Sequence, residues 1–162
     1  MLKAKIESTL ICAILVIMDV VVKIWAVNVL PSGRIVVIPG LFNLTYVENR
    51  GMAFGLLYGH SNILAIVTGL LMAGMLAYIW FGKHNDKWLI RLIMLVIAGG
   101  LGNLIDRITR GFVVDYLDFS AIFGFPVFNL ADCCVVVGCI AMLIYVFIME
   151  RKQMKANQES DI

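Results

Sequence analysis

Long apolar runs dominate this chain, and short polar stretches separate them. A helix of about 20 apolar residues is long enough to cross a bilayer. Each run is close to that length, so the pattern predicts four transmembrane helices. The predicted spans are residues 8–30, 63–81, 88–105 and 129–149.

The segment between the first two spans, residues 34–59, has a different character. It is rich in β-branched and aromatic residues and is interrupted by Pro39 and Gly40. This pattern predicts two short strands, at 35–38 and 42–47, joined by a turn. Because an open sheet edge cannot face lipid, we expect this β-rich segment to lie at the membrane surface or to pack on the helices.

Composition supports a membrane protein and excludes several other classes. Of the 162 residues, 62% are hydrophobic, and the mean hydropathy is +0.96, whereas a soluble domain is about half apolar. We therefore expect a single integral membrane domain, residues 1–162. The formal charge of +2 is too small to indicate a nucleic-acid partner. The four cysteines lie in apolar sequence without metal-ligand spacing, so we expect no metal and no cofactor.

The distribution of Lys and Arg predicts how the spans are oriented. Basic residues gather before the first span, around the turn between the second and third, and in the tail at 150–162. Cytoplasmic loops carry an excess of Lys and Arg. We therefore expect both termini in the cytoplasm, with the β-rich segment and residues 113–132 on the outer side. The basic residues concerned are Lys3, Lys5, Lys83, Lys87, Arg91, Arg151, Lys152 and Lys155.

Three carboxylates lie in residues 113–132, between two spans: Asp115, Asp118 and Asp132. Acids beside membrane-length apolar sequence are costly unless they are paired or functional. Two carboxylates that meet at one water can share a proton and hydrolyse a peptide bond. We expect Asp115 and Asp132 to form such a pair, although spacing alone slightly favours a solvated loop acid plus a helix-capping acid. Strand alternation places Asp115 and Asp118 on opposite faces without saying which face is inward.

Further polar residues accompany the spans at helical spacing. Asn103 and Arg107 are four apart and share a face, and so do Asp19 and Lys23. The first pair fits either a functional site or a helix-packing seam with an interfacial arginine. The second fits an ion pair that fixes helix packing.

Five motifs in order give the chain a family resemblance. They are Asp19-x-x-x-Lys23, Asn49-x-Gly51-x-Ala-Phe, GGLGNLIDR, VVDY and FPVFNLAD. Together they resemble the lipoprotein signal peptidases, also called signal peptidase II. The resemblance implies an aspartic endopeptidase of the bacterial cytoplasmic (inner) membrane, with four transmembrane helices and a small extracytoplasmic sheet. It also implies removal of signal peptides from diacylglyceryl-modified prolipoproteins, on the amino side of the lipidated cysteine.

The resemblance also implies roles for particular residues. Asp115 and Asp132 fall on the family's catalytic aspartates, near the outer face, which leaves Asp118 as a surface acid. Expected partners are the lipidated prolipoprotein and membrane lipid, and we expect a monomer. Met52 replaces a usually small residue and Val20 a usually polar one, which bears on fine specificity. The supporting and substrate-binding residues implied are Asp19, Lys23, Asn49, Gly51, Asn103, Arg107 and Asn129.

Two other classes of function remain compatible with the residues alone. Asp19, Lys23, Asp115 and Asp132 could form a relay in a small proton-coupled transporter or channel subunit. A relay needs polar groups through the midplane, whereas Asp115 and Asp132 lie at span ends. A non-catalytic membrane scaffold is the other alternative.

Overall fold

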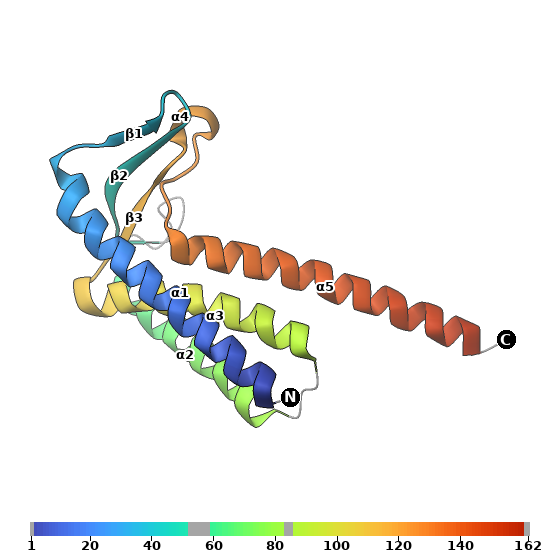
Figure 1. Cartoon of the computed structure of the whole chain (residues 1–162). Coiled ribbons are helices and arrows are strands. Elements are labelled where there is room, and N and C mark those ends of the chain that lie inside the picture. The colour runs from blue at the N-terminus through green and yellow to red at the C-terminus, as the bar shows by residue number, and fades with distance from the viewer. Residues whose placement is uncertain (1, 52–58, 83–85, 161–162) are drawn as a thin grey trace.

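The computed structural model describes residues 2–51, 59–82 and 86–160 (Figure 1). In this part of the chain, four helices are long and apolar enough to cross a membrane. They confirm the prediction of four apolar, membrane-length helices. The helices are α1 (Leu2–Val29), followed by the short 3-10 helix η1 (Leu30–Ser32), then α2 (Ser61–Phe81), α3 (Lys87–Arg110) and α5 (Leu130–Ser160).

Helix α1 begins at Leu2, before its predicted start, and helices α3 and α5 continue past their predicted C-terminal ends. Helix α3 continues to Arg110, where Gly111 adopts a left-handed conformation (φ 79°) and closes the helix by donating to the carbonyl of Arg107. Helix α5 continues through the polar tail to Ser160 and projects past the other helices (Figure 1). The tail is helical because Arg, Lys, Gln, Met and Ala, which it contains, are strong helix formers.

A small antiparallel sheet lies at one end of the helices (Figure 1). Its strands are β1 (Ile35–Ile38), β2 (Phe42–Asn49) and β3 (Val113–Asp118), in the order β1-β2-β3. The first two confirm the predicted strands, and β2 is two residues longer than expected. Strand β3 pairs with β2 so that Asp115 lies opposite Val47. This pairing places the end of β2 beside the strand that carries Asp115.

The segment between β3 and α5 leaves the sheet and returns to it. It contains the short helix α4 (Ser120–Phe123). On return, Phe128 forms a bridge with Leu117: the amides of Tyr116 and Leu117 donate to the Phe128 carbonyl, and the Phe128 amide donates to Leu117. The backbone is therefore fixed just before α5 begins.

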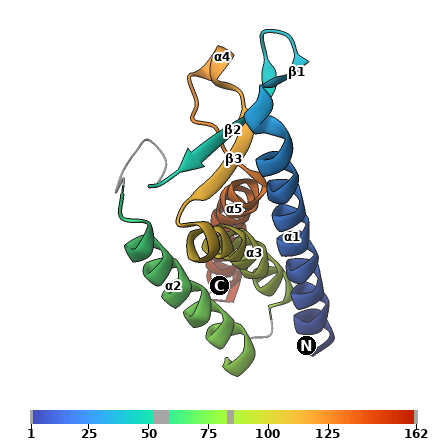
Figure 2. The same cartoon turned by 90° about the vertical axis from the view of Figure 1, so that its left-hand side faces the viewer.

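Helix α3 is the central helix, and it contacts α1, α2 and α5 (Figure 2). Glycines allow the closest approaches. A Cβ atom at Gly99 would overlap the carbonyl oxygen of Ala131, and one at Gly138 would lie 2.7 Å from Val96 Cγ2. Close backbone approach at small residues is typical of membrane helix pairs. It brings the polar residues of α3 into the range of α1 and of the start of α5.

Candidate active site

Asp115 is held in the middle of strand β3, and only 1% of its surface is exposed. Each of its carboxylate oxygens accepts a hydrogen bond from an amide side chain. Asn49 Nδ2 donates to Oδ2 at 2.9 Å, and Asn129 Nδ2 donates to Oδ1 at 2.6 Å. Asn49 reaches it because β2 and β3 are neighbours. The carboxyl group is thus fixed from the sheet on one side and from the start of α5 on the other.

Asp132 lies in the first turn of α5 and is half-buried. Asn103 Nδ2, from α3, donates to Oδ1 at 2.7 Å, and the Asn129 backbone amide donates to Oδ2 at 3.1 Å. The positive end of the helix dipole also favours a carboxylate here. Of the two aspartates, Asp132 is the one that remains accessible.

Asn129 joins the two aspartates. Its side-chain nitrogen donates to Asp115, its backbone amide donates to Asp132, and its side-chain oxygen accepts from the Asp132 amide at 2.9 Å. It also donates to Asn103 Oδ1 at 3.1 Å. The structure therefore brings Asp115 and Asp132, separated by seventeen positions in the sequence, into one hydrogen-bonded cluster.

The environment of Asp115 favours its protonated form. Burial, and after it the nearby charge of Asp132, raises the pKa of Asp115 from 3.8 to about 7, although the hydrogen bonds from Asn49 and Asn129 act in the opposite direction. Two carboxylates in one site rarely both ionise, because like charges disfavour each other at short range. Near neutral pH, the cluster can hold one proton between the two groups.

A buried ion pair supports Asn103 from behind. Lys23 and Asp19 on α1 are 2.8 Å apart, and their side chains are almost completely buried. Lys23 Nζ also donates to Asn103 Oδ1 at 2.9 Å, and Asp19 Oδ1 accepts from the Ala131 amide at 3.0 Å. The predicted Asp19–Lys23 pair is therefore present, and it orients Asn103 as well as packing the helices.

Asp106 belongs to the same cluster, although the sequence analysis did not select it. It forms ion pairs with Lys23, at 3.2 Å, and with Arg110. Its Oδ2 accepts from the Val114 amide at 3.0 Å, one residue before Asp115. The sequence signal that could have identified Asp106 is its position as an acid near the end of an apolar span. Asp106 fixes strand β3 to helix α3.

Arg107 contacts the backbone just after the end of strand β2. Its Nη2 donates to the Gly51 carbonyl at 3.2 Å, and the Gly51 amide donates to Asn49 Oδ1 at 3.1 Å. Arg107 thereby fixes the backbone next to Asn49. The support that Arg107 gives to Asp115 in this structure therefore passes through Gly51 and Asn49. Met52 and the Ala53-Phe54 part of the motif lie outside the described residues, and Val20 is half-buried on α1.

Asp118 is not a surface acid, contrary to expectation, because only 8% of its surface is exposed. It accepts from the Ser120 amide at 2.9 Å. The hydrogen bonds from Ser120, and after them one from Asn43, lower the pKa of Asp118. Asp118 is buried because β3 pairs there with Asn43 of β2. Asp118 therefore fixes the backbone at Ser120, the first residue of α4, and lies outside the cluster of Asp115 and Asp132.

Comparison with known proteins agrees with this arrangement. The family model described as Signal peptidase (SPase) II matches residues 11–148. The lipoprotein signal peptidase of Clostridioides difficile (strain 630) is 46% identical over 145 residues, covering 88% of this chain and 96% of the relative. That of Streptococcus pneumoniae (strain ATCC BAA-255 / R6) is 37% identical over 146 residues, covering 88% and 94%.

Solved structures share the fold. One described as a bacterial membrane enzyme matches with a TM-score of 0.79 at 30% identity, covering 91% of this chain and 90% of the other. A second with the same description gives 0.77 at 32% identity, covering 86% and 92%. These matches give no support to the transporter alternative, and they confirm the resemblance seen in the motifs. The chain belongs to the signal peptidase II family, whose members are membrane proteases.

Proposed function

We propose that Asp115 and Asp132 are the catalytic pair with which this protease removes the signal peptide from lipoprotein precursors. The observation that carries the proposal is the position of Asn129, which hydrogen-bonds to both carboxylates and fixes one relative to the other. Hydrogen-bonded positioning of two titratable groups with different environments is typical of acid–base pairs. Here one carboxylate is buried and the other is accessible.

The pair would act through a single shared proton. The ionised carboxylate takes a proton from water, and the water oxygen attacks the scissile carbonyl carbon. The protonated carboxyl group donates its proton to the carbonyl oxygen. When the tetrahedral intermediate collapses, the carboxyl group that took the water proton gives it to the leaving nitrogen and the carbon–nitrogen bond breaks. The other carboxylate takes a proton from a hydroxyl group of the intermediate, which becomes the new carboxyl group of the product. The pair again holds one proton, so no metal or cofactor is required.

The arrangement of charge and sheet supports a location for the substrate. With the basic ends of the helices in the cytoplasm, the sheet and both aspartates lie near the outer face of the bacterial inner membrane. The signal helix and the diacylglyceryl group would lie between the transmembrane helices. The scissile bond, on the amino side of the lipidated cysteine, would then reach Asp115 and Asp132.

Substitution of each aspartate tests the proposal. We expect Asp115→Asn and Asp132→Asn each to reduce cleavage of a purified, diacylglyceryl-modified precursor by about 10³-fold or more, because the proton transfers are lost. Cleavage would be followed by mass spectrometry of the released signal peptide.

Asp118→Asn is the matched control, since Asp118 lies on the same strand and is also buried. Thermal unfolding of all three variants separates lost chemistry from lost folding. Substantial cleavage by a folded Asp115→Asn or Asp132→Asn variant would rule out the pair.

A further inference from the structure

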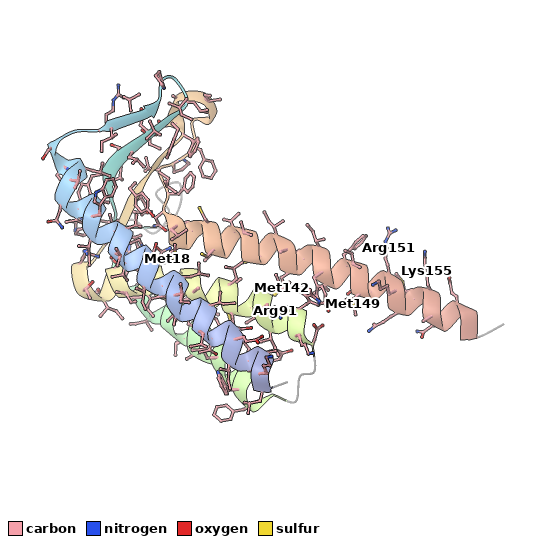
Figure 3. All side chains as sticks on the ribbon, in the orientation of Figure 1. Met18, Arg91, Met142, Met149, Arg151 and Lys155 are labelled. Carbon is pink, nitrogen blue, oxygen red and sulfur yellow. The ribbon has the colours of Figure 1, made fainter. Side chains whose placement is uncertain are left out.

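Arg91, near the start of α3 and away from the sheet (Figure 3), lines two openings. One is a narrow, mostly apolar groove of about 130 Å³ between α1 and α3. It is lined by Ser8, Ile11, Cys12, Leu15, Met94 and Leu95 together with Arg91. The other is a wider pocket of about 610 Å³ between α3 and α5, lined by Asp86, Lys87, Trp88, Arg91, Tyr145 and Met149.

The wider pocket is lined by two cations and one carboxylate, so its net charge is positive. Lys87 and Arg91 are exposed, and neither forms an ion pair within the described part of the chain. Asp86 also lines the pocket, but its carboxylate already accepts from the amides of Trp88 and Leu89 and from the Tyr145 hydroxyl at 2.6 Å. Its charge is directed at those three donors, so an anion in the pocket would meet the two cations.

The aromatic neighbour of Arg91 is typical of a membrane interface. The guanidinium lies 4.9 Å from the centre of the Trp88 ring, and Trp88 is 61% exposed. Tryptophan is enriched where lipid headgroups meet the hydrocarbon layer. An apolar groove, an interfacial tryptophan and two free cations together match a ligand with an anionic head and an apolar chain.

We propose that this end of the molecule binds an anionic phospholipid of the cytoplasmic leaflet. The phosphate would lie between Lys87 and Arg91, with one acyl chain along the groove between α1 and α3. The inference rests on the orientation given under the proposed function, because the cytoplasmic leaflet is the one rich in anionic lipid. A signal peptide would not fit here, since its amino-terminal region is positively charged and the pocket would repel it.

Lipid titration of the purified full-length chain in neutral detergent tests the site. Native mass spectrometry would compare dioleoyl phosphatidylglycerol with dioleoyl phosphatidylcholine, and we expect tighter binding of the anionic lipid. A basic residue near an anionic surface contributes roughly a fivefold change in affinity. We therefore expect the double variant Lys87→Gln/Arg91→Gln to bind phosphatidylglycerol about 25-fold more weakly.

Control variants separate this site from general charge. Lys155→Gln removes an exposed basic residue of α5 that lines neither opening, and we expect it to change affinity less than twofold. Arg91→Lys keeps the charge and should retain most of the binding. Equal binding of the two lipids, or an equal loss in Lys155→Gln, would overturn the proposal.

Further measurements identify the ligand and keep the result independent of catalysis. Ile11→Trp narrows the groove, so it should weaken phosphatidylglycerol binding. Inorganic phosphate should not displace the lipid at comparable concentrations; displacement would show a site for soluble anions and overturn the proposal. Precursor cleavage in lipid-free detergent should be unchanged in the double variant. If the unmodified chain does not cleave the precursor, the proposed function is wrong. The lipid titration still shows whether the anionic lipid binds at Lys87 and Arg91.

Discussion

Helix α1 carries two ion pairs at the same four-residue spacing, and they differ in almost every other respect. Lys3 and Glu7 lie 3.9 Å apart near the start of the helix, with side chains that are 89% and 46% exposed. Asp19 and Lys23 lie 2.8 Å apart, with side chains that are 2% and 0% exposed. Lys3 and Glu7 form no other ion pair within the described part of the chain, whereas Lys23 also contacts Asp106 and Asn103.

The difference shows that burial, and not spacing, decides what a helical ion pair does. An exposed pair is screened by solvent and contributes little. A buried pair is stabilising only while all its members are present, because removal of one leaves an unpaired charge. Lys23 is buried because α3 approaches α1 at Gly102, where a Cβ would lie 2.5 Å from Asp19 Oδ2. The buried pair of Asp19 and Lys23 therefore positions Asn103 and the start of α5.

The largest effect is expected for Lys23→Met. The substitution keeps a similar shape but leaves Asp19 and Asp106 without their shared cation, and Asn103 loses a donor. Breaking a buried pair costs about 3–5 kcal/mol. We expect the free energy of unfolding in detergent to fall by that amount and precursor cleavage to fall with it. If the Lys23→Met variant is as stable as the unmodified chain, burial does not distinguish the Asp19–Lys23 pair from the Lys3–Glu7 pair.

A smaller effect is expected when α1 and α3 are kept from approaching. Gly102→Ala would place a methyl group against Asp19, and we expect it to lower the free energy of unfolding by about 1–3 kcal/mol. Gly74→Ala is the matched control, because Gly74 is also helical and a Cβ there meets nothing within 4 Å. It should be neutral or stabilising. Thermal unfolding measures both, and equal shifts would contradict the packing argument.

Burial also has an effect at Asp115, where it predicts how kcat/KM depends on pH. Burial, and after it the charge of Asp132, raises the pKa of Asp115 to about 7. We therefore expect kcat/KM to fall above pH 7 by about tenfold per pH unit, as the shared proton is lost. A profile that stays flat from pH 6 to about 9 would contradict the shared proton.

The raised pKa of Asp115 also makes the free energy of unfolding fall as the pH rises. The folded protein retains a proton on Asp115 at pH values where the unfolded chain has released it. The contribution of this group to the free energy of unfolding is complete below its ordinary pKa of 3.8 and is lost as the pH rises through about 7. Thermal unfolding of Asp115→Asn should lose this pH dependence.

The smallest effect is expected for Lys3→Met, at the exposed pair. We expect a change in the free energy of unfolding of no more than about 0.5 kcal/mol. The measurement is the same unfolding experiment in low and high salt. A loss comparable to that of Lys23→Met would show that spacing alone suffices.

The sequence predicted the membrane helices and the first two strands because each depends on local pattern. Asp115 and Asp132 were selected by the family resemblance, since spacing alone left Asp118 open. The burial of Asp118 and the role of Asp106 could not be predicted in the same way. Both depend on β3 pairing with β2 and docking on α3, which join residues far apart in the chain.

The bridge between Leu117 and Phe128 has a consequence for protein engineering. It closes residues 119–127 into a loop whose two ends are already joined, and Asn129 follows directly. Lengthening such a loop costs little, about 0.6 kcal/mol for each doubling of its length. Segments of different length or sequence could therefore be grafted between β3 and α5 while Asp115 and Asp132 keep their separation, which makes this loop the natural place to diversify a library of variants.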